Sequence, residues 1–129
     1  MKRQVIYVMS HDSIGLGEDG PTHQPIEHLV TLRATPNLNN WRPADLTETA
    51  VAWYNAVSSK TAPTSIILTR QGLPSIVDNK DTAELIKNGG YALKFNNNSE
   101  VNLVASGSEV HLIMDAANHW LKMWEKENG

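Results

Sequence analysis

Cysteine is absent from this 129-residue chain, which excludes a disulfide framework, a thiolate metal site and a cysteine nucleophile. Excess charge of one sign is also missing, because 11 lysines and arginines stand against 14 aspartates and glutamates, for a net charge of −3. That balance gives no electrostatic basis for binding nucleic acid or an acidic membrane surface. We therefore expect neither as a partner.

Long apolar runs are missing as well. The first run, Val5–Met9, is short for the core of a signal peptide and far too short to span a membrane. We expect a cytoplasmic protein with no membrane partner. The remaining composition, 40% hydrophobic and 19% charged, is typical of a soluble globular protein, and the length suffices for one average domain or parts of two.

Residues 1–70 alternate between the patterns of strands and helices. The runs Val5–Met9 and Ser65–Leu68 are typical of strands that are covered on both faces. Asp45 and Glu48 form a variant of the capping box at the start of a helix whose apolar residues Leu46, Ala50, Trp53 and Val57 share one face. The expected elements are a strand at 5–9, a loop at 10–24, a helix from Pro25 to Pro36, a strand at 40–42, a helix over 45–57 and a strand at 65–68. This order predicts an α/β fold with a parallel sheet.

Residues 71–89 contain glycine, proline and a charged run, and their apolar residues do not recur at the spacing of a long helix or a strand. This pattern predicts a linker with a short helical turn at 81–87. Residues 91–95 and 101–105 resemble the strands of a hairpin, and Ser106 and Glu109 are expected to open a final helix. The apolar stripe of that helix is Val110, Ile113, Ala117, Trp120, Leu121 and Trp124. One hairpin and one helix are too little for a domain, so we interpret the chain as a segment of a larger protein.

The stretch from residue 11 to residue 28 combines three histidines, four carboxylates, three glycines and two prolines. Gly15, Gly17 and Gly20 match the spacing of a dinucleotide fingerprint, but that site needs a strand directly before it and a helix opening at the third glycine. Pro21 follows instead, so we attribute the match to chance. The histidine spacings do not resemble a helical metal-binding pair, and we expect no metal site. The glycines and prolines suggest a backbone shaped to aim polar side chains inward.

This loop resembles, almost residue for residue, the substrate loop of transketolase. The resemblance is carried by HDSIGLGEDGPTHQP at 11–25, LRATPN at 32–37, RPAD at 42–45, LTRQGLP at 68–74 and ASGSEV at 105–110. It implies that residues 1–70 are the second half of a pyrimidine-binding domain, 71–89 an interdomain linker and 90–129 the start of a C-terminal domain. The implied fold class is α/β: part of a doubly wound parallel sheet, followed by the first strands and helix of a second α/β domain.

The resemblance also implies an activity, the transfer of a two-carbon ketol unit between phosphorylated ketose and aldose sugars in the pentose phosphate pathway. His11 and Arg70 correspond to residues that contact the sugar phosphate, a role that suits a guanidinium fork. Asp19 corresponds to the aspartate that accepts a hydrogen bond from the C2 hydroxyl. His23 corresponds to the catalytic histidine near the reacting carbon, where imidazole can transfer a proton or stabilise an oxyanion.

Thiamine diphosphate and Mg²⁺ are the cofactors that the resemblance implies, but their main ligands in the family have no counterpart in this sequence. We therefore expect the chain alone to be inactive. The expected partners are phosphorylated sugars and either the remaining transketolase domains or the second subunit of a homodimer. Two other interpretations stay open: a non-catalytic transketolase-like binding or split-subunit protein, and a thiamine enzyme similar to dihydroxyacetone synthase.

Overall fold

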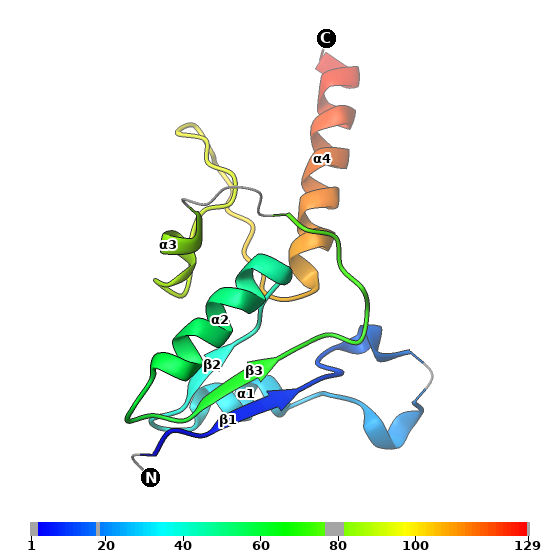
Figure 1. Ribbon diagram of the computed structural model, residues 1–129. Helices are drawn as coiled ribbons and strands as arrows, with labels where there is room; N and C mark the ends of the chain where they lie inside the picture. The colour runs from blue at the N-terminus through cyan, green and yellow to red at the C-terminus, as the bar shows by residue number, and fades with distance from the viewer. Residues whose placement is uncertain (1–2, 18, 77–81, 129) are drawn as a thin grey trace.

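A small parallel sheet is the centre of the molecule (Figure 1). The computed structural model describes residues 3–17, 19–76 and 82–128. The strands are β1 (Ile6–Met9), β2 (Asn39–Trp41) and β3 (Thr64–Ile67), in the order β1-β3-β2. Both outer strands run parallel to β3, with Ile6 and Asn39 each opposite Thr64. The predicted α/β fold with a parallel sheet is confirmed.

Four α-helices accompany the sheet within the described residues: α1 (His28–Ala34), α2 (Leu46–Ser58), α3 (Thr82–Ile86) and α4 (Glu109–Asn128). Two 3₁₀ turns, Ile14–Leu16 and Pro21–His23, interrupt the loop after β1. The predicted helical turn at 81–87 forms as α3, and residue 81 lies outside the described residues. None of the helices in the described ranges combines the length and the hydropathy needed to cross a membrane.

The helix α2 lies against one face of the sheet, where Ala52 and Ala56 pack on Ile66 of β3 (Figure 1). Its capping box is confirmed. The Asp45 carboxylate accepts a hydrogen bond from the Glu48 amide at 2.9 Å, and the Glu48 carboxylate accepts one from the Ala44 amide at 2.7 Å. The first bond satisfies one of the amides that the first turn of a helix leaves without partners, and the second holds Glu48 to the amide of the residue before the cap.

The face of α2 that packs inward differs from the predicted one. Val51, Ala52 and Ala56 are buried, whereas the predicted stripe of Leu46, Ala50, Trp53 and Val57 is exposed. The helix is apolar on more than one side, so periodicity alone did not select the inner face. The small alanines allow the helix to approach the sheet closely, which the larger side chains of the predicted stripe would prevent.

The hairpin expected at 91–95 and 101–105 does not form, because neither segment becomes a strand or joins the sheet. Only the turn between them is present, with the Ser99 amide donating to the Asn96 carbonyl at 3.2 Å. An isolated two-stranded hairpin is marginal in water. Tyr91 and Leu93 instead pack beside Val51 of α2.

Two helix starts also differ from the prediction. The helix α1 begins at His28 and not at Pro25, and the Gln24 side-chain amide before it donates to the Gly20 carbonyl at 3.1 Å. The helix α4 begins at Glu109, so Ser106 and Glu109 do not form the predicted capping box. The apolar stripe of α4 is exposed at Trp120 and Trp124, and the helix projects away from the sheet (Figure 1).

Candidate functional site

The site residues predicted from the sequence follow β1 and β3. These strands are parallel neighbours, so their carboxyl ends lie at the same edge of the sheet. His11, Asp19 and His23 belong to the loop after β1, and Arg70 comes three residues after the end of β3. The parallel pairing thus places the beginning of the loop after β1 beside the beginning of the segment after β3.

His11 and Asp19 lie close together in the loop. The His11 Nε2 atom is 3.6 Å from Asp19 Oδ2, and both side chains are a little under half exposed. The other ring nitrogen, Nδ1, is 2.8 Å from the Ser10 hydroxyl. The backbone φ of His11 is 67°, in the left-handed region that non-glycine residues rarely adopt. The two side chains therefore present an imidazole and a carboxylate together at the loop surface.

Arg70 and Gln71 pack against the glycines of the same loop. A Cβ atom added to Gly17 would lie 3.4 Å from Arg70 Nη1, and one added to Gly15 would lie 1.8 Å from the Gln71 side-chain nitrogen. Gly17 has a φ of 89°, which independently favours glycine. The structure thus brings the exposed Arg70 guanidinium to the loop that carries His11 and Asp19.

His23 stands apart from this group. It ends the second 3₁₀ turn, is exposed, and its Nδ1 atom lies 2.9 Å from the Thr22 hydroxyl. Within the described part of the chain, no hydrogen bond or ion pair joins His23 to His11, Asp19 or Arg70.

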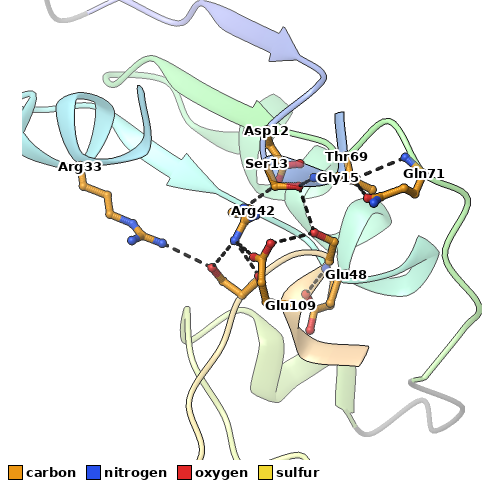
Figure 2. A network of polar contacts seen from close by, with 12 residues as sticks. Asp12, Ser13, Gly15, Arg33, Arg42, Glu48, Thr69, Gln71 and Glu109 are labelled. Carbon is orange, nitrogen blue, oxygen red and sulfur yellow. Dashed lines mark hydrogen bonds and ion pairs between the residues drawn. The ribbon is translucent and has the colours of Figure 1, made fainter. Parts of the chain in front are cut away.

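Sequence reasoning missed a buried polar network behind the loop (Figure 2). Arg42 Nε donates to Asp12 Oδ2 at 2.6 Å, and Arg42 Nη1 donates to the Ser106 carbonyl at 2.8 Å and to the Glu109 carboxylate. The side chains of Asp12 and Arg42 are only 1% and 9% exposed. The Ser13 and Ser108 hydroxyls lie 3.5 Å apart beside this network.

The charges of this network shift the titration of two members. Burial raises the pKa of Glu109, but the hydrogen bond and positive charge of Arg42 outweigh it and hold that pKa below its ordinary value. Burial likewise lowers the pKa of Arg42, but its hydrogen bonds to Glu109 and Asp12 outweigh it and raise that pKa. Both residues are therefore charged at neutral pH.

The described side chains contain no group of three or more histidines, aspartates or glutamates placed to hold a metal ion. The loop carries an imidazole and a carboxylate side by side, and a guanidinium packs on its Gly17; these groups suit the hydroxyl and phosphate groups of a sugar phosphate.

Comparison with known proteins gives a consistent result. Residues 1–75 match the family model "Transketolase, pyrimidine binding domain". A transketolase of Buchnera aphidicola is 52% identical over 119 residues, which cover 92% of this chain and 18% of that protein. A Pichia stipitis transketolase mutant superposes with a TM-score of 0.85 at 46% identity, covering 98% of this chain and 18% of that one.

The Pichia stipitis transketolase in complex with sedoheptulose 7-phosphate superposes with a TM-score of 0.79 at 48% identity. The match covers 92% of this chain and 17% of that structure. The chain thus spans less than a fifth of the length of the relatives it matches.

Proposed function

Because the chain belongs to the transketolase family, we propose that the loop 11–25 and Arg70 bind a phosphorylated sugar during two-carbon ketol transfer between ketose and aldose phosphates. The observation that carries this proposal is that the His11–Asp19 pair and Arg70, which packs on Gly17 of the same loop, follow the carboxyl ends of two parallel strands. Open α/β sheets bind ligands at that edge. A structural relative with a TM-score of 0.79 was solved with a sugar phosphate.

Each residue has a role that its chemistry suits. Arg70 offers a planar fork of donors that matches phosphate oxygens, and His11 offers a ring nitrogen as a further donor. Asp19 accepts a hydrogen bond from a sugar hydroxyl and so favours one configuration at that carbon. His23 acts on the reacting carbon as a proton donor or acceptor. The role of His23 rests on the matched loop sequence alone.

The chain would supply only part of a whole enzyme. We propose that residues 1–70 form the second half of a pyrimidine-binding domain, a boundary supported by the family match over 1–75. Residues 71–89 would then link it to the start of a C-terminal domain at 90–129. Thiamine diphosphate and Mg²⁺ are the cofactors of the proposed activity, and side chains outside this sequence would hold them.

The proposal can be tested in a full-length transketolase that carries these 129 residues in place of its own. We expect Arg70→Ala and His11→Ala to raise KM for a phosphorylated sugar and to leave KM for an unphosphorylated aldehyde little changed. Loss of a charge-assisted contact costs about 1.5–3 kcal/mol, which corresponds to a roughly ten- to hundred-fold rise in KM. Steady-state kinetics with both substrates measures the difference.

The other two residues give different expected signatures. Asp19→Ala should reduce discrimination between sugars that differ at the C2 hydroxyl. His23→Ala should lower kcat by roughly 10²–10⁴ if it transfers a proton in the transition state. His28→Ala is the matched control, because it removes the third histidine of the segment and should leave both constants unchanged. The proposal fails if all four loop and Arg70 variants merely raise KM for every substrate and lose stability together.

A further inference from the structure

Arg42 joins three segments that lie far apart in the sequence (Figure 2). It follows directly after β2, its Nε atom binds Asp12 in the loop after β1, and its Nη1 atom binds Ser106 and Glu109 at the start of α4. The Gly107 amide donates to the Arg42 carbonyl at 3.0 Å. A Cβ atom on Gly107 would lie 2.8 Å from Arg42 Nε, so the arginine is packed directly on this glycine.

Asp12 depends on Arg42 for its charge compensation. Its side chain is 1% exposed, and its second carboxylate oxygen, Oδ1, has no hydrogen-bond partner. Within the described residues, Arg42 is the cation that pairs with this buried side chain. Removing one partner of a buried ion pair is strongly destabilising, so we expect loss of Arg42 to displace Asp12.

Asp12 directly follows His11, the residue with a φ of 67°. Such a backbone conformation persists only where the surroundings enforce it. The surroundings here are Asp12, held by Arg42, and Ser13, whose hydroxyl lies 3.5 Å from that of Ser108 and accepts a hydrogen bond from the Gly15 amide at 3.3 Å. Of the two residues after His11, Asp12 thus binds Arg42, and Ser13 contacts Ser108 directly before α4.

We propose that Arg42 is a positioning residue for the sugar-phosphate loop: it holds Asp12, and through it His11, in the binding geometry, and it ties this loop to the start of α4. This inference rests on the proposed function for its catalytic consequence, but not for its structural part. Arg42 lies behind the loop with its side chain 9% exposed, so it acts on the ligand through Asp12 and not by contact.

The structural part is tested by hydrogen exchange of the 129-residue chain. We expect Arg42→Met to speed amide exchange at residues 11–16 by roughly tenfold or more, the factor that corresponds to the loss of a charge-assisted hydrogen bond. Glu109→Gln keeps the bond between Arg42 and Asp12 and should give a smaller increase. Tyr91→Phe is the matched control, because it removes a hydrogen bond to Glu48 of α2 and should leave the loop unchanged.

A second variant covers the case in which Arg42→Met does not fold. The pair Asp12→Asn and Arg42→Gln removes both buried charges at once, which avoids an unpaired carboxylate. Its loop should still exchange faster than that of the unmodified chain. Unchanged exchange at residues 11–16 in the pair variant overturns the inference, whatever the outcome for Arg42→Met.

The catalytic part is tested in the full-length transketolase that carries this segment. Arg42→Lys keeps the charge but not the fork, and it should raise KM for a phosphorylated sugar relative to an unphosphorylated aldehyde, by up to about a hundredfold for a misplaced contact. Tyr91→Phe should leave that ratio unchanged, which separates positioning from general destabilisation. If exchange changes but the KM ratio does not, and His11→Ala also leaves the ratio unchanged, the proposed function is wrong while the coupling stands. If His11→Ala alone changes the ratio, the positioning role is wrong.

Discussion

The Glu48 side chain of α2 binds two other parts of the chain, the residue Ala44 before the helix and the distant Tyr91. One carboxylate oxygen accepts a hydrogen bond from the Ala44 amide, and the other accepts one from the Tyr91 hydroxyl at 2.7 Å. Burial raises the pKa of the Tyr91 phenol, and the hydrogen bond and negative charge of Glu48 raise it further, well above its ordinary value. The folded chain therefore retains this proton more strongly than the unfolded chain does.

This pKa shift predicts a loss of stability at alkaline pH. Because the folded pKa of Tyr91 is raised, its contribution is fully present below the unfolded value of 10.0 and declines as pH rises beyond it. Denaturant unfolding from pH 8 to pH 11 should show the free energy of unfolding falling faster in the unmodified chain than in Tyr91→Phe. Parallel curves for the two proteins would show that the hydrogen bond to Glu48 contributes nothing.

Residues that interact within one turn were predictable from the sequence, and residues that interact across the fold were not. Asp45 and Glu48 are three positions apart, so their capping box could be predicted from spacing alone. Asp12 and Arg42 lie 30 positions apart in two separate loops, and nothing local marks them as partners. Glu109 was interpreted as a capping residue because its spacing from Ser106 fits, whereas its carboxylate binds Arg42.

At the scale of elements, the sequence specified strands and helices better than it specified their faces. The strands 6–9 and 64–67 and the extent of α2 follow from apolar runs and from a cap. The buried side of α2 depends on which residues fit against β3, and the small Ala52 and Ala56 decide that. The predicted hairpin at 91–95 and 101–105 does not form, because an isolated pair of strands needs a third strand or a packed face for stability, and these residues supply neither.

The helix α4 carries a prediction of its own. Trp120 and Trp124 stack with ring centroids 6.2 Å apart and are 64% and 57% exposed. Exposed apolar surface of this kind favours self-association in water. We expect sedimentation velocity to show an average mass that rises with concentration, and Trp120→Glu to shift the chain toward monomer.

Lys122→Glu is the control for this prediction, because Lys122 lies on the opposite side of α4 from Trp120 and the substitution also adds negative charge. It should leave association unchanged. A concentration-independent monomer in the unmodified chain would show that the tryptophan stripe does not drive association.

At the scale of the whole molecule, the hydrophobic core is thin. Buried apolar residues divide into one cluster around Val51 and Ile86 and another around Ala52, Ala56 and Ile66. Among the side chains that the structure describes, Ile66 is the largest that is fully buried. The edge strand β1 and most of α4 are exposed, which agrees with a segment whose relatives are more than five times longer.

The donor set of the chain predicts how it responds to thiamine diphosphate and Mg²⁺. The described residues hold no group of three or more histidines, aspartates or glutamates suited to a metal ion, so we expect the 129-residue chain to give no saturable heat with both added at micromolar concentration in titration calorimetry. A full-length transketolase that carries the segment should bind under the same conditions. Saturable binding by the chain alone would contradict this prediction and would require a diphosphate site among its own residues.

The strand order has a consequence for how the chain acquires its structure. The central strand β3 is the last of the three in the sequence, and among the residues that the structure describes it is the partner of both β1 and β2. During synthesis, neither β1 nor β2 can form these ladder bonds until residues 64–67 have been made. Pairing β1 with β3 then closes a loop of more than fifty residues, and non-local pairing of this kind slows the formation of a sheet.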